Sequence, residues 1–238
     1  MNINIAKLGN LLYVYCPWAY RPLYGAYKAF ADRAERRLLS DALRPGMIVA
    51  DVGANIGAYS AFFASRVKSE GTVYAFEPEH RNFDGLVGIG RKWPNIRAVN
   101  AAVGAQSGTL KLYMSGDLNV DHHTYDDGEG RQAIEVPVVQ LDAFFPPGNR
   151  VDLIKMDIQG YELPALHGAR RVLTENRDVK LLLEYWPYGL RRAGTEPAAL
   201  LRYLRELGFT LDTPEKGRSI EAIGENVNDY INIYAHRS

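Results

Sequence analysis

The fold of this chain is decided by the stretch Val49-Ala50-Asp51-Val52-Gly53-Ala54-Asn55-Ile56-Gly57. A short apolar strand ends in an acid, a glycine-rich turn follows, and a helical pattern begins at Ala58. Glycine is needed in such a turn because the backbone must bend sharply and let a ligand approach closely. Ligands of open α/β sheets bind outside the carboxyl ends of the strands. The position of this turn therefore predicts a binding site.

Strand and helix patterns alternate on both sides of the turn, which predicts a mostly parallel sheet with helices on both faces. We expect strands at Met47–Val52, Thr72–Phe76, Ile96–Val103, Val151–Met156 and Val179–Glu184, with closing strands at Phe209–Leu211 and Tyr230–Tyr234. We expect helices at Ala58–Val67, Glu79–Trp93, Leu163–Leu173 and Pro197–Leu207. The fold class is α/β, with a doubly wound sheet.

The alternation is interrupted in the middle of the chain. Thr109–Met114 and Ala133–Leu141 have strand patterns, and no helical pattern precedes either one. Between them lies Ser115–Arg131, which is rich in Asp, Gly and His. Loops of this length are usually functional or disordered. We therefore expect an inserted β-hairpin with a long loop.

The N-terminal part of the chain is rich in aromatic residues. From Pro22 the spacing is helical, and Leu23, Tyr27 and Phe30 share one face with Ala34 and Leu38. This helix is interpreted either as packed on the domain edge or as a cap over a substrate, including a contact with a lipid-linked substrate at a membrane surface. We expect residues 1–44 to be an extension packed on a single domain at 45–238.

The composition excludes several classes of protein. Apolar residues make up 47% and charged residues 24% of the 238 residues, which is typical of globular domains. Lys and Arg together number 28, as do Asp and Glu, so the formal net charge is zero. This balance argues against electrostatic binding of nucleic acid over the whole surface. With one cysteine, Cys16, and no segment of about 18 apolar residues, we expect a cytoplasmic protein with no membrane span. A local surface contact with a membrane and a homo-oligomer remain open.

Asp51 indicates which kind of ligand the turn binds. The dinucleotide fingerprint is G-x-G-x-x-G, whereas Gly53 and Gly57 follow the spacing G-x-x-x-G with Asp51 two residues ahead. An acid at this place repels a pyrophosphate but suits a cationic amine, such as that of the methionine part of S-adenosylmethionine. Backbone N–H groups can bind the carboxylate of such a ligand, and they belong to Gly53, Ala54, Asn55 and Gly57.

The next two strand ends supply the other cofactor contacts. Glu77 ends the second strand, where a carboxylate can accept hydrogen bonds from both ribose hydroxyls. Enzymes that use NAD also place an acid there, so an NAD-dependent oxidoreductase is the alternative. Small residues around Ala102, after the third strand, can form a slot for adenine.

Several segments of the chain resemble one known family, the FkbM-type S-adenosylmethionine-dependent methyltransferases. They lie between about Pro45 and Glu184 and are Asp51–Gly57, Ala75–Pro78, Val139–Asp142, Ile154–Glu162 and Gly168-Ala169. The resemblance implies a Rossmann-like fold, S-adenosylmethionine, and O-methylation of sugars, glycoconjugates or polyketide-like natural products. The family usually has Glu where Gln159 stands, which keeps a non-catalytic cofactor-binding module as a further alternative.

Methyl transfer to an alcohol needs a base close to the carboxyl ends of the first and fourth strands. Asp157 ends the fourth strand and can act as base, orient the acceptor hydroxyl, help to hold a divalent cation or bind the cofactor; otherwise it caps the helix that follows. Glu184 ends the fifth strand, and His122 lies in the long loop. Asp121-His122-His123 contains metal-ligand types, but neighbouring side chains diverge in an extended segment. No metal site is therefore predicted, and a divalent cation stays open.

Overall fold

The computed structural model describes residues 12–13, 15–115, 122–126, 128, 130–215, 217–224 and 226–237. Asp121 of the long loop and residues 1–11 of the expected extension lie outside these ranges. The division of the chain at residue 44 stays a prediction. No helix of the described part is both long and apolar enough to cross a bilayer.

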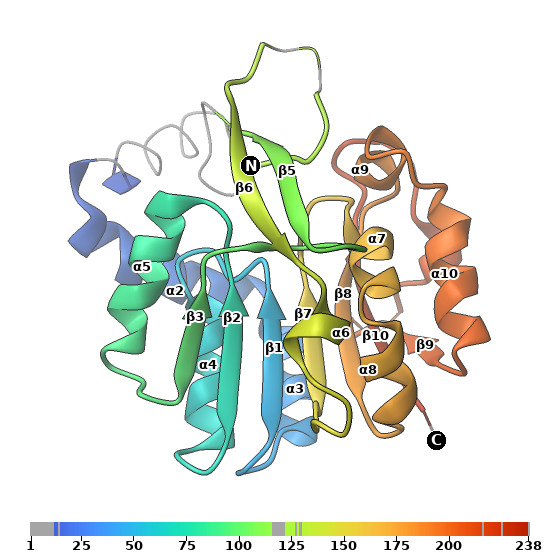
Figure 1. Cartoon of the computed structure of the whole chain (residues 1–238), viewed down its shortest axis with the longest axis horizontal. Coiled ribbons are helices and arrows are strands. Elements are labelled where there is room, and N and C mark those ends of the chain that lie inside the picture. Colours follow the sequence, from blue (N-terminus) through green and yellow to red (C-terminus); the bar gives the residue numbers. More distant parts are fainter. Residues whose placement is uncertain are drawn as a thin grey trace.

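Seven strands of the described part form a central sheet in the order β3-β2-β1-β7-β8-β10-β9 (Figure 1). The neighbouring strands from β3 to β8 run parallel, and β10 runs antiparallel to both β8 and β9. The bounds are β1 Ile48–Val52, β2 Thr72–Phe76, β3 Ile96–Val99, β7 Leu153–Met156, β8 Lys180–Tyr185, β9 Thr210–Asp212 and β10 Ile231–His236. The expected mostly parallel sheet is confirmed.

Helices cover both faces of this sheet because successive strand residues point to opposite sides. Val49 packs in one core with Phe63 of α4, while its neighbour Ala50 packs in the other core with Leu166 of α7. On the first face lie α3 Arg33–Ala42, α4 Ala58–Val67 and α5 His80–Gly90, with α2 Pro17–Ala31 beside α3 and α4. The second face carries α7 Glu162–His167, α8 Arg170–Glu175 and α10 Pro197–Glu206, and the short helices are α6 Leu141–Phe144 and α9 Pro187–Arg192.

A smaller sheet stands beyond the carboxyl ends of the central strands (Figure 1). It contains β4 Ala102–Val103, β5 Gly108–Tyr113 and β6 Ala133–Val139 in the order β4-β6-β5. β5 and β6 are antiparallel, so the expected hairpin is confirmed. β4 pairs in parallel with β6. The smaller sheet therefore forms a wall over the end of the sheet where a ligand is expected.

The strand expected at Ile96–Val103 is wrong as one element, because β3 and β4 belong to different sheets. The chain turns at Asn100, whose side-chain amide donates to the carbonyl oxygens of Glu77 and Pro78 at 2.8 and 3.1 Å. Ala101 N–H then donates back to the Val99 carbonyl at 3.0 Å. These contacts tie the third strand end to the second one and send the chain into the smaller sheet.

Two expected helices also differ from the structure. The helix expected at Leu163–Leu173 is divided into α7 and α8, because Gly168 packs directly on the backbone of Gly104 and leaves no room for a side chain. The helix expected from Pro22 begins earlier, at Pro17, and ends before Asp32, where α3 follows. Proline is favoured in the first helical turn, and Pro17 takes that position.

Candidate functional site

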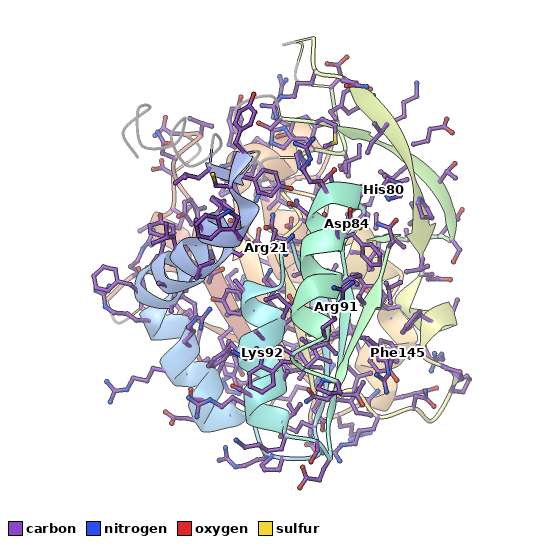
Figure 2. All side chains as sticks on the ribbon, turned by 90° about the vertical axis from the view of Figure 1, so that its left-hand side faces the viewer. Arg21, His80, Asp84, Arg91, Lys92 and Phe145 are labelled. Carbon is purple, nitrogen blue, oxygen red and sulfur yellow. The ribbon has the colours of Figure 1, made fainter. Side chains whose placement is uncertain are left out.

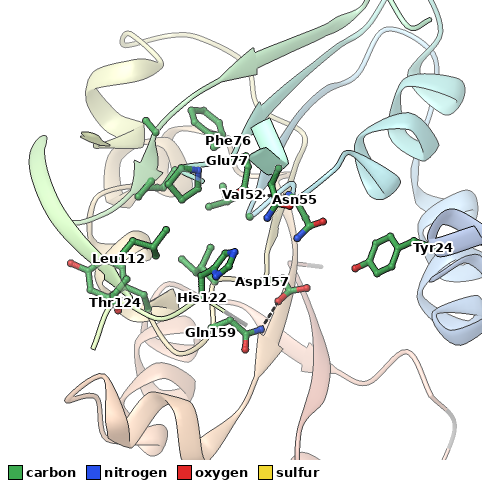
Figure 3. A pocket seen from close by; sticks show the side chains of 18 residues that line it. Tyr24, Val52, Asn55, Phe76, Glu77, Leu112, His122, Thr124, Asp157 and Gln159 are labelled. Atoms are coloured by element: carbon green, nitrogen blue, oxygen red, sulfur yellow. Dashed lines mark hydrogen bonds between the residues drawn. The ribbon is translucent and has the colours of Figure 1, made fainter. Parts of the chain in front are cut away.

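A pocket opens at the point where the sheet order reverses. From β1 the chain continues to β2 and β3 on one side and later crosses to β7 on the other side of β1. The pocket holds about 760 Å³ of empty space, including its open mouth (Figure 3). It is lined by Tyr24, Val52, Gly53, Asn55, Phe76, Glu77, Pro78, Asn82, Ala101, Ala102, Val103, Leu112, His122, Thr124, Asp157, Ile158, Gln159 and Tyr161. Ligands of open α/β sheets bind at this place.

The turn after β1 is shaped by close backbone contacts. Gly53 has a φ of 74°, and a Cβ at this position would collide with the carbonyl oxygen of Asp157. Gly57 also has a positive φ, 88°, but it packs against α5 and does not line the pocket. Ala54 is buried beneath the turn, whereas Asn55 lines the pocket. The expected turn residues thus divide into pocket-lining and supporting ones. Their backbone N–H groups all donate within the chain: Gly53 and Ala54 to the Phe76 carbonyl, Asn55 to Glu77 and Gly57 to the Ala54 carbonyl. Binding of a ligand carboxylate by these N–H groups stays a prediction.

Glu77 presents a buried carboxylate to the pocket. One oxygen accepts the backbone N–H of Asn55 at 2.8 Å, and the other accepts the N–H of Glu79 at 3.0 Å. Burial raises the pKa of Glu77 to about 7, against the lowering effect of these two hydrogen bonds. The carboxylate is therefore rigidly placed, and hydroxyl groups that donate to it favour its ionised form.

An apolar wall continues from Glu77 along the pocket. It is formed by Phe76, Ala102, Val103 and Leu112, from β2 and the smaller sheet. Ala102 therefore lies where the sequence placed a slot for a flat base. This wall and the Glu77 carboxylate are the features that an adenosine needs.

Asp51 lies beneath the turn and does not line the pocket. Ser60 Oγ donates to its Oδ2 at 2.6 Å, and Lys155 Nζ lies 3.7 Å from its Oδ1. Burial raises the pKa of Asp51, and Lys155 and Ser60 oppose this rise. In the structure a lysine of the chain therefore faces Asp51, and a contact between Asp51 and a ligand amine stays a prediction.

Lys155 is a site residue that the sequence reasoning missed. Its ammonium also lies 3.6 Å from Asp157 Oδ2 and donates to the Gly53 carbonyl oxygen at 3.2 Å. The signal was present in the strand Leu153–Met156, because a lysine in a wholly buried run must be paired with an acid. Lys155 thus joins the buried Asp51 to Asp157, which does line the pocket.

Asp157 and Glu184 are joined by one side-chain amide. Gln159 Nε2 donates to Asp157 Oδ1 and to Glu184 Oε2, both at 3.1 Å (Figure 3 shows the first of these bonds). Burial opposes ionisation of Asp157, but the ammonium groups of Lys155 and Lys28 and the Gln159 amide hold its pKa below the usual value. Burial and the charges of neighbouring carboxylates raise the pKa of Glu184 well above its usual value. The two carboxylates are therefore unequal.

A second cavity of about 430 Å³ of empty space lies on the other side of Asp157. Its lining is mostly polar and consists of Lys28, Asp32, Tyr59, Lys155, Met156, Asp157, Leu182, Glu184, Tyr230 and Asn232. Glu184 lines this cavity and not the first one, whereas Asp157 lines both. The carboxylate pair therefore stands between the two cavities.

His122 lines the first pocket, as expected, but its ring is oriented by the backbone. Its Nδ1 accepts the N–H of Ser115 at 3.1 Å, so the neutral ring carries its proton on Nε2. In this tautomer Nε2 is a hydrogen-bond donor, and the lone pair of the ring lies on Nδ1. The adjacent His123 is buried and stacks on Tyr125. No group of three or more metal-ligating side chains is found among the residues that the structure describes.

Two further residues were not singled out by the sequence for the contacts they make. Buried Glu162 accepts the backbone N–H groups of Ile158 at 3.1 Å and Gly160 at 3.4 Å, which holds the turn that carries Gln159. Tyr24 reaches the pocket from α2. No local pattern indicates this contact, because α2 is far from the motif in sequence.

The pocket fits S-adenosylmethionine on its own geometry. A rigid carboxylate for ribose, an apolar wall for adenine and a glycine turn without room for a side chain meet in one pocket. Glu77, Ala102 and Asp157 are the residues that would hold the cofactor, and Gly53 would let it approach the turn closely.

Solved structures with a similar fold include methyltransferases. A protein from Clostridium thermocellum, provisionally described as an rRNA methylase, has a TM-score of 0.54 and 9% identity over 86% of this chain and 95% of its own. A provisionally described methyltransferase from Streptococcus mutans, in complex with S-adenosylhomocysteine, has a TM-score of 0.52 and 12% identity, and the match covers 86% of this chain and 96% of its own. Fibrillarin from Aeropyrum pernix, with bound S-adenosylmethionine, has a TM-score of 0.52 and 15% identity, and the match covers 85% of this chain and 74% of its own. Identities this low show a shared fold alone.

The family assignment comes from the sequence. A search of curated proteins found no significant match. Residues 51–211 match the model of the family described as methyltransferase FkbM domain. This match decides against the dehydrogenase alternative that Glu77 left open. Because it spans more than half of the chain, the protein belongs to the FkbM family of methyltransferases, and its methyl donor is S-adenosylmethionine.

Proposed function

We propose that this methyltransferase transfers the methyl group to a hydroxyl oxygen of a sugar, a glycoconjugate or a polyketide-like natural product. The observation that carries the proposal is the pair Asp157 and Glu184, which share the Gln159 amide between the cofactor pocket and a polar cavity. When bound, S-adenosylmethionine supplies a methyl carbon activated by a sulfonium. The protein must then position a hydroxyl and accept its proton.

Glu184 is the better base of the pair. A general base works best when its pKa lies near the working pH. The raised pKa of Glu184 moves it toward that range, whereas the lowered pKa of Asp157 keeps this group ionised and weakly basic. We assign proton acceptance to Glu184 and orientation of the hydroxyl to Asp157. His122 then contributes a hydrogen-bond donor at the pocket wall.

The second cavity suits an acceptor with several hydroxyl groups. Lys28, Asp32, Asn232 and Tyr230 line it together with the carboxylate pair. These groups can donate hydrogen bonds to hydroxyls, and accept hydrogen bonds from them, at several positions. An apolar acceptor would leave the same groups without hydrogen-bond partners, which costs free energy. Among the acceptor classes proposed, the cavity therefore favours saccharides.

The test is a screen of methyl transfer from labelled S-adenosylmethionine to saccharides and other hydroxylated acceptors, with and without a chelator. We expect a labelled product whose new methyl group is an ether on a former hydroxyl. Cofactor binding without transfer to any hydroxylated acceptor would contradict the proposal, as would a methyl group on nitrogen or carbon. Loss of transfer with the chelator would add a divalent cation to the account.

A further inference from the structure

Helix α2 has an inner face that belongs to the site. Tyr20, Tyr24 and Lys28 are spaced four residues apart and therefore share one side of the helix. Tyr20 is buried, Tyr24 lines the cofactor pocket, and Lys28 lines the polar cavity. Arg21 points toward α5, with its guanidinium near Gly88 (Figure 2). This side of α2 is thus occupied by contacts with the domain.

The outer face of α2 is apolar and exposed. Large side chains on this face and on the turn before it are 53–79% exposed, and they are Tyr15, Trp18, Leu23, Tyr27 and Phe30. Pro22 and Ala26, between them, are exposed as well. In the part of the chain that the structure describes, the other exposed large apolar residues are Val87, Val227 and Tyr230. Contiguous exposed apolar patches mark interaction sites.

Positive charge borders this outer face. Arg33 and Arg37 are exposed on α3, which follows α2 directly, and the Arg33 guanidinium lies 5.2 Å from the centre of the Phe30 ring. The acids of this segment are engaged elsewhere. Asp32 pairs with Lys28 at 2.8 Å, and buried Glu35 accepts from the side chain of Asn232 at 2.8 Å. From Pro17 to Leu38 the exposed charged residues are Arg33 and Arg37, and the exposed Asp41 lies one turn farther along α3.

We propose that the outer face of α2 docks on an anionic lipid bilayer. Trp, Tyr and Phe side chains insert at the level of the lipid headgroups, and exposed arginines bind anionic headgroups. The charge favours lipid over a second copy of the chain, because an identical face would bring the same two arginines, and the exposed Asp41 lies farther along α3 than either of them. Docking would place the helix that lines both cavities on the membrane surface.

The test is co-sedimentation of the full chain with vesicles of phosphatidylcholine alone or mixed with phosphatidylglycerol. We expect binding to the mixed vesicles that falls as salt is added. The double variant Trp18→Ser/Phe30→Ser should weaken this binding by about tenfold or more, since two apolar side chains no longer insert. Arg33→Gln/Arg37→Gln should weaken binding to the mixed vesicles selectively.

The control variant is Val227→Ser, which alters a side chain that is 55% exposed elsewhere on the molecule. It should bind vesicles like the wild type, and thermal unfolding should show that all variants are folded. Absence of vesicle binding, or binding that the Trp18→Ser/Phe30→Ser variant retains, would overturn the proposal. Equal binding to both kinds of vesicle would overturn its electrostatic part. A dimer in sedimentation velocity that this variant dissociates would make a second copy the occupant.

Discussion

The carboxylates around the pocket differ in how strongly they hold a proton, and their surroundings explain why. Burial raises the pKa of Glu77 to about 7 and, with neighbouring acids, raises the pKa of Glu184. Asp157 is only half-buried, and Lys155 and Lys28 lower its pKa. Environments that separate the pKa values of nearby acids assign them different roles. Cofactor binding and proton transfer should therefore depend on pH in different ways.

We expect the affinity for S-adenosylhomocysteine to rise with pH. Ribose hydroxyls that donate to Glu77 stabilise its ionised form. In the free protein the carboxyl is protonated at pH values below its pKa of about 7, so binding at such a pH must release this proton. Calorimetric titrations should give about tenfold tighter binding at about pH 8 than at about pH 6. Glu77→Gln should bind more weakly, without this dependence. An affinity that is flat with pH in the wild type would contradict the ribose contact.

Glu184→Gln should lower kcat by about 10²–10⁴-fold, because the variant cannot accept the acceptor's proton. Since the base must be ionised, the kcat of the wild type should rise with pH up to the raised pKa of Glu184, and the variant should lack this rise. S-adenosylhomocysteine affinity should stay within about twofold, since Glu184 does not line the cofactor pocket. The exposed Glu206→Gln is the matched control. A fully active Glu184→Gln would reassign the base.

Lys155→Met should lower the free energy of unfolding by about 3–5 kcal/mol, because it leaves the buried Asp51 carboxylate without its cation. Adding Asp51→Asn should restore part of the loss. The deficit should shrink as pH falls, because Asp51, whose pKa burial already raises, takes up a proton and the neutral acid needs no cation. Urea unfolding at several pH values measures this. A single variant as stable as the wild type would show that the pair is unimportant.

At the scale of elements, the turn that follows β1 packs against the turn that follows β7, with the Gly53 backbone in contact with the Asp157 carbonyl. Gly53→Ala would place a methyl group against the Asp157 carbonyl, and it would force alanine into the φ of 74° that Gly53 adopts. Relief of this collision would displace residues that line the pocket. We expect weaker unfolding stability and at least about tenfold weaker S-adenosylhomocysteine binding. Gly90→Ala is the control, since a Cβ there meets nothing within 4 Å. Wild-type affinity in Gly53→Ala would show that the turn is not part of the pocket.

The elements that local signals define were predicted well from the sequence. Ala58–Val67 and Thr72–Phe76 have the predicted bounds, since glycines at 57 and 71 precede them. The break after Val99 and the break at Gly168 were not predicted. Each depends on a contact with a distant segment: Asn100 with the backbone of Glu77, and Gly168 with the backbone of Gly104. Such contacts leave no periodic signal.

At the scale of the molecule, the site combines residues from both sides of the sheet's reversal point. Strand-end reasoning brought Glu77, Ala102 and Asp157 to one pocket, because parallel strands end on the same edge. It did not place Lys155 beside Asp51 or Tyr24 at the pocket, because those contacts depend on packing between strands and from α2. Gln159 shows the same limit. Its amide donates to two acids, where the usual Glu would add a third negative charge.

The central claim is that one pocket, between the ends of β1, β2 and β7, holds the cofactor. It lies beside Asp157 and Glu184, the two carboxylates that act on the acceptor. The most direct measurement is a crystal structure of the protein with S-adenosylhomocysteine. The account predicts ribose hydroxyls on the Glu77 carboxylate, the base against the wall that contains Ala102, and the sulfur on the Asp157 side of the pocket. A ribose turned away from Glu77, or a cofactor bound away from the Gly53 turn, would contradict it.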